Sequence, residues 1–420
     1  MSENEKRGSI LRPFRNRNFV LVWTGQAVSS IGNTMYRVTL AWTVYNVTNS
    51  SAAMGLVLAV NVVPQLLLTL LGGVLADRLP RRSLMLVCDL AAGLVTALLA
   101  AVAAAHGSSL GFFLAVALVL GIVSSFFGPA YSPIYRNLLS IEDQQAAAAI
   151  QTTTKNLTQV LGPALGGLVL SLGGAVLGFG LDAGTFFFAA VCTTLVTVPK
   201  GTVKYHGTVF GDLKRGLVLV SRVGWLRTVI LISLLANVAC VAPIVVLLPA
   251  VVKDVGGGGE LLGVANAVLA ASSSLFALVA GKYAHRVPRG VAVYLLAAVV
   301  GLGVVMLGEG VSMHWLILPA MAVVGLGFAF NVLESAMIQE QTPERYLSRV
   351  YSVAMVASYV LGPLGYSAAG ALANSVGDRN VLLWGGVLLA AVSIGGGFAT
   401  RWRLSGTVEL DEPELAHSAA

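Results

Sequence analysis

Five charged side chains lie well inside long apolar stretches of this sequence, namely Arg37, Asp89, Lys155, Asp182 and Glu334. If such stretches cross a lipid bilayer, each charge is costly unless it faces water, meets an opposite charge or is neutralised by a proton. These residue types in this setting point to ion pairs that open and close a gate, or to carboxylates that carry a proton. The helices around them must then enclose a polar cavity.

The depths of these residues in their segments predict two partnerships. Arg37 and Asp182 both fall in the outer half of the membrane and could pair, or Arg37 could extend to the lipid headgroups instead. Lys155 and Glu334 fall towards the inner face, so they could close a gate, or Glu334 could hold a coupling proton, or both. Glu334 could also be a solvated acid that attracts cations. Asp89 or Asp182 would then be the next candidate to carry the coupling proton. Asp89 is expected mainly to support the arginines of a nearby loop.

That loop is the charged motif Gly73–Arg82, which lies between two apolar segments and contains Asp77 and the arginines Arg78, Arg81 and Arg82. Glycine at its start lets two helices approach closely. A related motif recurs in the second half of the chain at 281–289, where Arg286 and Arg289 match the arginines and His285 replaces the acid. An internal repeat of this kind is typical of transporters built from two related halves. We therefore expect Asp77 and these arginines to form a loop that switches with conformation.

The pattern Gly73-x-Leu75-Ala76-Asp77-Arg78-x-x-Arg81-Arg82 resembles the loop 2–3 signature of the major facilitator superfamily, although Pro80 stands where that family usually has glycine. An ordinary basic loop that only fixes topology is the alternative interpretation. The resemblance covers the chain from about residue 12 to residue 403. It implies an all-α membrane protein with twelve transmembrane helices in two pseudo-symmetric six-helix bundles.

Composition independently indicates a membrane protein, because 56% of the residues are hydrophobic and only 11% are charged. A helix needs about 20 apolar residues to cross a bilayer. Twelve stretches are long enough: 19–44, 52–76, 83–104, 110–131, 146–172, 175–198, 226–251, 261–284, 291–308, 313–336, 350–373 and 381–400. The predicted domains are a cytoplasmic arm (1–18), an N-terminal bundle (19–198), a cytoplasmic linker (199–224), a C-terminal bundle (225–403) and a disordered cytoplasmic tail (404–420).

The net charge of +7 is placed in a way that indicates membrane orientation. Lysines and arginines fall almost entirely in loops on one side of the twelve-helix topology, with Lys253 and Arg379 in the opposite loops. Both termini are therefore predicted to be cytoplasmic, in a multi-pass protein of the plasma membrane. The basic excess fits anionic lipid rather than nucleic acid. The expected partners are a small-molecule substrate, protons and the bilayer; we expect a monomer with no cofactor or metal.

Polar side chains at helical spacing predict a cavity wall. Gln26, Ser30, Asn33 and Arg37 are four, three and four residues apart, which puts them on one face of the first predicted helix. A polar face on a membrane helix should meet other helices or water rather than lipid. Further candidates for the cavity are Asn61, Gln65, Tyr131, Gln151, Asn237 and Asn331.

The fifth predicted helix has a small-residue face that includes Gly162, Pro163, Gly166 and Gly167. This stretch resembles the antiporter motif of drug-exporting members of the superfamily. Its physical content is a helix that can bend and pack closely, and glycine-rich faces of this kind are common in membrane helices. Leu361-Gly362-Pro363 repeats the pattern in the eleventh predicted helix.

The opening Phe14–Phe19, the fifth helix and the length resemble the macrolide-efflux and siderophore-export branch of the superfamily. That resemblance implies antiport: a hydrophobic or amphipathic small molecule leaves the cell, with drug resistance as one result, while protons enter. The alternative on the same fold is import of a small nutrient. A membrane-embedded enzyme is a remote alternative, because all five histidines fall in loops or helix ends and His-Glu-x-x-His is absent. An ATP-driven pump is disfavoured, since the sequence has no Gly-x-x-x-x-Gly-Lys-Ser/Thr loop.

Overall fold

The computed structural model describes residues 11–131, 134–197, 220, 223–283 and 288–400, and these residues contain helices but no strand. The first half has η2 (Arg12–Arg15), α1 (Arg17–Thr48), α2 (Ser51–Arg78), α3 (Arg81–Ala104), α4 (Leu110–Tyr131), α5 (Ile134–Leu138) and α6 (Ile141–Leu195). The second has α8 (Gly224–Ala236), η3 (Asn237–Val241), α9 (Ala242–Asp254), α10 (Gly259–Tyr283), α11 (Arg289–Gly310), η4 (His314–Leu316), α12 (Ile317–Gly327), α13 (Phe330–Gln341), α14 (Glu344–Val376) and α15 (Asp378–Ala399). The predicted all-α class is confirmed.

Within the described residues, nine helical stretches are long and apolar enough to cross a membrane. One of them, α6, has 55 residues, which is about 80 Å of helix and far more than one crossing needs. Gly174 divides it, with φ 63° and ψ −159°, a backbone conformation that residues with a Cβ avoid. Counting both parts of α6, and adding the more polar α1 and α14, the described helices supply the twelve membrane-length segments expected from the sequence.

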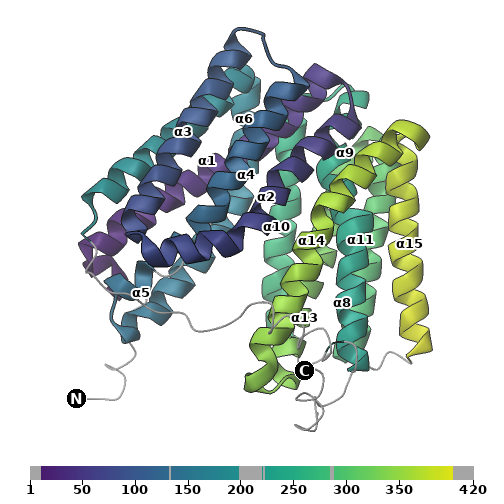
Figure 1. Cartoon of the computed structure of the whole chain (residues 1–420). Helices are drawn as coiled ribbons and strands as arrows, with labels where there is room; N and C mark the ends of the chain where they lie inside the picture. The colour runs from purple at the N-terminus through teal and green to yellow at the C-terminus, as the bar shows by residue number, and fades with distance from the viewer. Residues whose placement is uncertain (1–10, 132–133, 198–219, 221–222, 284–287, 401–420) are drawn as a thin grey trace, which may run out of the picture. The chain divides into compact units, whose positions relative to one another are not determined.

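Two compact units divide the chain. The first unit comprises Met1–Lys204 and Val252–Ala267, and the second comprises Tyr205–Val251 and Val268–Ala420. In the first unit α6 packs along both α1 and α3, while α2 packs against α4 (Figure 1). In the second unit α11 packs along α15 and α12. Most of the predicted linker and tail, and the first ten residues of the arm, lie outside the described residues.

Several helix boundaries differ from the sequence prediction. The eleventh segment begins at Glu344 rather than near residue 350, so residues 344–349 belong to α14. The tenth segment is interrupted between α12 and α13. The seventh contains the π-helix Asn237–Val241 just before Pro243, where the missing proline N–H and its ring disturb the regular hydrogen-bond ladder.

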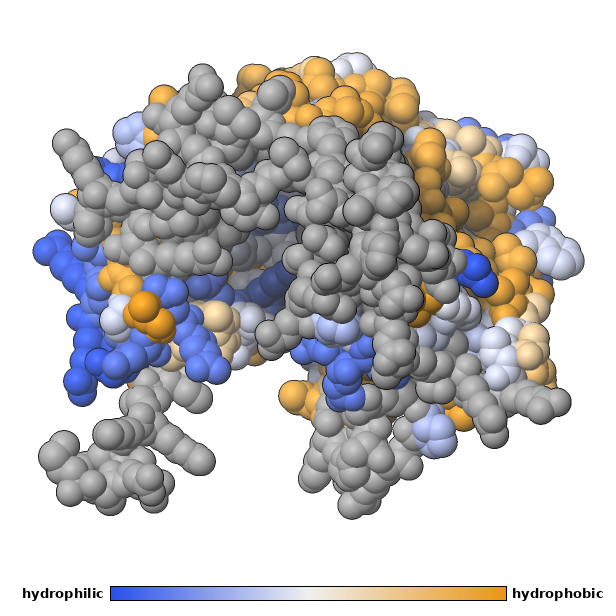
Figure 2. All heavy atoms as spheres, turned by 60° about the horizontal axis from the view of Figure 1, so that its bottom comes forward, coloured by the Kyte–Doolittle hydropathy of each residue, from blue (hydrophilic) through white to orange (hydrophobic). Residues whose placement is uncertain are grey.

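The surface of the described helices suits a lipid environment. Large apolar side chains such as Leu67, Leu172, Leu278, Trp384 and Phe398 are more than two-thirds exposed. Figure 2 shows hydrophobic residues as broad areas of the surface and hydrophilic residues as separate patches. Exposed apolar areas of this extent are rare on soluble proteins and are satisfied by lipid chains.

Candidate functional site

A cavity of about 370 Å³ lies among α1, α4 and α6 of the first unit. It is lined by Trp23, Gln26, Ala27, Ser30, Tyr131, Ala148, Gln151, Thr152, Thr154 and Lys155. The α1 residues recur at intervals of three or four, so one helical face forms that wall. We call this space the central-wall cavity. It brings together five residues singled out from the sequence, which are Gln26, Ser30, Tyr131, Gln151 and Lys155.

Hydrogen bonds across the cavity fix its polar wall. The indole Nε1 of Trp23 on α1 donates to Thr154 Oγ1 on α6 at 3.0 Å. The hydroxyl groups of Tyr131 and Tyr135 are 2.7 Å apart. Lys155 is exposed and lines the same cavity. The site therefore presents amide, hydroxyl and ammonium groups beside aromatic rings.

A chain of aromatic contacts supports this wall from the N-terminal side. Phe14 of η2 packs edge-on against both Phe19 and Trp23, with ring centroids 5.6 Å and 4.9 Å apart. Phe19 in turn meets Tyr135 at 5.5 Å, and Tyr135 meets Tyr131 at 5.3 Å. Edge-to-face pairs of this geometry are favourable beyond their buried area. The short helix η2 is thus part of the support of the cavity.

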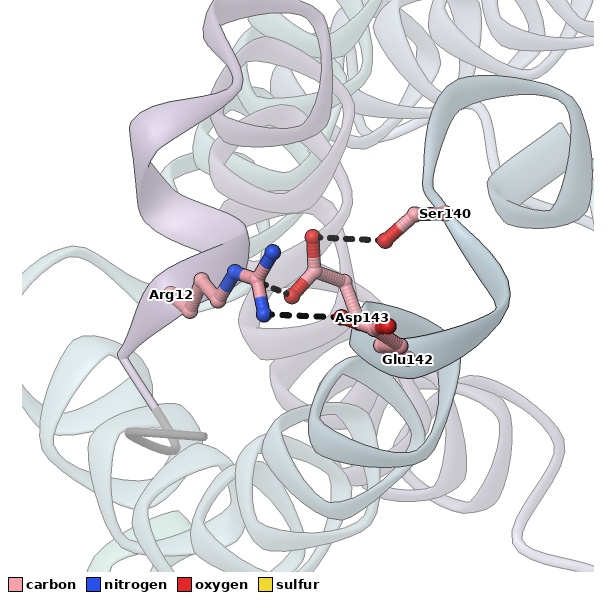
Figure 3. Close-up of polar contacts among 4 residues, drawn as sticks. All are labelled: Arg12, Ser140, Glu142 and Asp143. Atoms are coloured by element: carbon pink, nitrogen blue, oxygen red, sulfur yellow. Dashed lines mark hydrogen bonds and ion pairs between the residues drawn. The ribbon is translucent and has the colours of Figure 1, made fainter. Parts of the chain in front are cut away.

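The start of the chain is also fastened to α6. Arg12 Nη1 lies 3.0 Å from Glu142 Oε2, and Arg12 Nε lies 3.2 Å from Asp143 Oδ1 (Figure 3). Ser140 donates to Asp143 Oδ2 at 3.0 Å. Asn16 caps α1 by accepting from the backbone N–H of Phe19, and its own amide donates to the carbonyl of residue 138 at 2.7 Å. These contacts hold η2 beside the cavity.

Asp89 lies at the junction of α1, α3 and α6, and is 2% exposed. The expectation that it supports the loop arginines is wrong for Arg82, which donates to the backbone carbonyls of Thr193 and Thr194 at the end of α6. Among the described residues no ion pair joins Asp89 to a cation. The side chains beside its carboxylate are those of Gln26 and Thr193. Arg82 therefore caps a helix terminus, which the helix dipole favours.

Asp182 is 1% exposed, and neither of its carboxylate oxygens has a hydrogen-bond partner in the part of the chain that the structure describes. The predicted pair with Arg37 is therefore not formed, and Arg37 is exposed instead. Asp182 Oδ1 lies against the bare Cα of Gly32, where an added Cβ would come within 2.7 Å of it. The alternative, in which the Arg37 side chain extends to the outer lipid headgroups, stays a prediction.

Glu334 of the second unit is 9% exposed and accepts a hydrogen bond from Ser233 at 2.8 Å. Lys155 belongs to the first unit, so its pairing with Glu334 stays a prediction. Asn237, also in the second unit, donates to the carbonyl of Ser233 at 2.9 Å, and Asn331 is exposed and donates to the carbonyl of Phe328.

The remaining cavity candidates of the first unit do not line the central-wall cavity. Asn61 of α2 donates to the carbonyl of Ala117 on α4 at 3.1 Å, and Gln65 donates to Asn61. The Asn61 amide thus joins α2 to α4. Asn33 is exposed. A larger cavity of about 540 Å³, which includes Glu260, contains none of the residues singled out from the sequence.

The glycines of the fifth predicted helix lie at close helix crossings. A Cβ on Gly166 would lie 3.1 Å from the Cα of Met35 on α1. A Cβ on Gly162 would overlap Thr34, and one on Gly167 would lie 2.5 Å from the Cα of Gly263 in the same unit. The motif thus acts as a packing face, as its residue types predict. Pro163 lies within α6 without breaking it.

The charged loop is only partly described. Arg81 begins α3, and its Nη1 is buried without a partner among the described residues. The side chains of Asp77, Arg78 and Arg289, the surroundings of Gly73 and all of Arg286 lie outside the described part of the structure. The proposed switching role of this motif therefore stays a prediction.

Sequence reasoning missed Trp23, Thr152 and Thr154, which line the cavity. Trp23 lies three residues before Gln26 and Thr154 three after Gln151, so extending the polar faces by one turn would have included Trp23 and Thr154. Arg12 is one of the basic residues interpreted above only as markers of membrane orientation, although Glu142 and Asp143, just before the fifth predicted segment, could have suggested its partners.

A family model described as the Major Facilitator Superfamily matches residues 22–366. The chain therefore belongs to the major facilitator superfamily, whose members are membrane transporters and not enzymes.

Curated relatives include transporters of known and unknown cargo. The uncharacterized MFS-type transporter YfiS of Bacillus subtilis is 24% identical over 91% of this chain and 93% of that protein. The enterobactin exporter EntS of Escherichia coli O127:H6 is 28% identical over 61% of this chain and 63% of that exporter. Macrolide efflux protein A of Streptococcus pyogenes is 20% identical over 90% of this chain and 94% of that protein.

Solved structures share the fold at low sequence identity. The nucleoside transporter NupG has a TM-score of 0.69 at 15% identity, covering 92% of this chain and 100% of that one. The D-xylose-proton symporter has a TM-score of 0.68 at 14% identity, covering 94% of this chain and 99% of that one. The fold is thus shared with transporters of different cargo.

Proposed function

We propose that this transporter exports a hydrophobic or amphipathic small molecule in exchange for protons, by alternating access in the plasma membrane with both termini in the cytoplasm. The observation that carries the proposal is the central-wall cavity. It combines the rings of Trp23 and Tyr131 with the polar groups of Gln26, Gln151 and Lys155. Apolar walls with a few convergent polar groups suit an amphipathic ligand.

The direction of transport is inferred from the relatives. An enterobactin exporter and a macrolide efflux protein both match this chain, the latter over nearly its full length. The glycine face of α6 against α1 supports a close helix pair that can slide while the transporter changes state. A symporter with the same fold is the reason that import stands as the competing hypothesis.

The charged groups fit a coupled cycle. We propose that Asp77 and the loop arginines stabilise one end state and that Lys155 with Glu334 closes the inner gate. Opening such a gate separates the two charges and exposes each of them to water, which lowers the cost of leaving them unpaired. The protein would work as a monomer without a cofactor.

Everted membrane vesicles provide the test. Vesicles with an acidic interior, made from cells that overproduce the protein, should accumulate erythromycin or enterobactin several-fold above vesicles from cells lacking it. Dissipating the proton gradient should remove that difference. Accumulation of a sugar or nucleoside in right-side-out vesicles, driven by protons entering with it, would support the import hypothesis and contradict export.

Cells give an independent readout. Overproduction should raise the concentration of erythromycin needed to stop growth, and Trp23→Ala should reverse that gain at equal protein levels. Ala27→Ser, a small change at the same cavity, serves as the control for expression and insertion.

A further inference from the structure

Asp89 is a buried acid that has no paired cation among the described residues. It is 2% exposed, and its Oδ2 atom has no hydrogen-bond partner among the described residues. Arg82, about two turns away on the same helix, donates hydrogen bonds to the backbone carbonyls of Thr193 and Thr194 instead. Burying an ionised carboxylate in this way is costly, whereas burying a protonated one costs much less.

Gln26 connects this acid to the central-wall cavity. Its side chain lies beside the Asp89 carboxylate and also lines the cavity. It is 7% exposed, and its Nε2 atom has no hydrogen-bond partner among the described residues. Two unsatisfied polar atoms, an amide donor and a carboxylate oxygen, therefore occupy one junction at the edge of a cavity. Buried polar groups without a hydrogen-bond partner usually mark a functional site, or the place of a proton or a water molecule.

The chemistry of glutamine makes this junction a switch. An amide has two N–H donors and a carbonyl acceptor, so it can donate to an ionised carboxylate or accept from a protonated one. We propose that Asp89 takes up and releases the coupling proton, and that Gln26 transmits its state to the cavity. This inference rests on the proposed proton-coupled export. Asp89 Oδ2 accepts a proton from a hydronium ion in the cavity, which leaves water, and later returns the proton to water.

Few other ionisable groups surround Asp89. Cys88 precedes it on α3 and Cys192 approaches it from α6. The ionisable residue of α4 is Tyr131, which lines the same cavity as Gln26, and so does Lys155. On α1 the ionisable residues nearest in sequence are Arg17 and Tyr36, nine and ten residues from Gln26 and thus about 14–15 Å along the helix. α2 has Asp77 and Arg78 only at its end.

The other buried acids lack this combination. Asp182 also has unpartnered oxygens, but it lies against Gly32 and Thr185, and neither residue lines the cavity. Glu334 receives a hydrogen bond from Ser233, and Ser233 does not line the central-wall cavity. Asp89 is therefore the described carboxylate with both an unfilled oxygen and a neighbour on the cavity wall.

Infrared titration of the purified, substrate-free protein tests the inference. The carbonyl stretch of a protonated acid at Asp89 should appear as pH falls, vanish in Asp89→Asn and persist in Glu142→Gln. Glu142 is the matched control, because it is a first-unit acid whose side chain is 76% exposed. Gln26→Leu should shift the frequency of the Asp89 band. If Asp89→Asn and wild type give the same titrating bands, the inference is wrong.

Proteoliposomes separate this inference from the proposed function. With erythromycin as probe, Asp89→Asn should lose at least tenfold in proton-driven accumulation but keep downhill exchange, and Asp89→Glu should recover part of the loss. Equal proton dependence in wild type and Asp89→Asn would overturn the role of Asp89 but leave the proposed export function intact. If wild type itself moves neither erythromycin nor enterobactin against a gradient, the proposed function fails, while the infrared result still decides whether Asp89 binds a proton.

Discussion

Gly162→Ala should weaken the contact between α1 and α6 that underlies the proposed sliding pair. In the structure a Cβ at this position would overlap Thr34 Oγ1 and lie 2.6 Å from Thr34 Cβ and 3.3 Å from the carbonyl oxygen of Ile31. The Thr34 hydroxyl is itself placed near the carbonyls of Ile31 and Thr158, at 2.9 Å and 3.2 Å. The threonine therefore cannot turn away without losing these contacts.

The expected magnitude follows from the overlap. Ordinary contact begins at 3.4 Å, so Thr34 Cβ must move by about 0.8 Å (3.4 − 2.6), and the helix backbone must move with it. Overpacking of this kind costs roughly 1–3 kcal/mol. For a domain of roughly 150–250 residues, each kcal/mol lowers the melting temperature by about 2–4 °C. Alanine is also the better helix former by about 1 kcal/mol, a gain that any Gly→Ala change inside α6 shares. Gly162→Ala should therefore unfold several degrees below a Gly→Ala variant of the same helix that meets no overlap.

Thermal unfolding of the purified protein in detergent, followed by tryptophan fluorescence, is the assay. Gly180→Ala is the control, because no heavy atom outside its own helix lies within 4 Å of that added Cβ, and alanine is the better helix former by about 1 kcal/mol. On a Thr34→Ala background, Gly162→Ala should cost less, since the overlapping hydroxyl is gone. Equal stability of Gly162→Ala and Gly180→Ala, or equal effects of Gly162→Ala on both backgrounds, would refute the packing argument.

Three further variants test the proposed switch, gate and arm. Asp77→Asn should reduce transport strongly while the protein inserts at normal levels, because an arginine loses its partner in one end state; near-normal vesicle transport would rule out this anchor. Glu334→Gln should keep the bond from Ser233 and lower the transport rate by a similar factor at every pH, as a gate residue would; loss of the pH dependence would instead move the coupling proton to Glu334. Arg12→Ala should lower stability by only about 1 kcal/mol or less, because its ion pairs are partly exposed; a melting-temperature loss as large as that of Gly162→Ala would contradict that estimate.

The helices were predictable because each needs a long apolar run. The break in α6 also had a sequence signal, since the two predicted segments ended at Leu172 and began at Ala175 on either side of Gly174. The ends were less predictable, because helices continue past the apolar run wherever polar residues can still reach water. The first turn of α14, from Glu344, is an example. The π-helix before Pro243 could not be placed from sequence, since a proline can produce either a kink or a bulge.

The site was predictable as a face but not as a set of contacts. The spacing of Gln26 and Ser30 marked one wall of the cavity, and Tyr131 and Gln151 were chosen as polar or aromatic members of apolar helices. The predicted pairing of Arg37 with Asp182 failed because it was inferred from depth in the membrane alone. Arg37 and Asp182 were matched by depth, yet depth does not say which way a side chain turns around its helix, and Arg37 is exposed. The position of Asp89 beside Gln26 required three helices to be packed.

Proton movement during transport by the purified protein is the most direct test of the central claim. Proteoliposomes that contain a pH-sensitive dye and no initial pH gradient should be given erythromycin or enterobactin on one side only. Coupled export predicts that protons cross the membrane opposite to the substrate, and that an uncoupler removes the dye signal without stopping downhill exchange. Protons that move in the same direction as the substrate, or substrate movement with no proton signal at all, would contradict proton-coupled antiport.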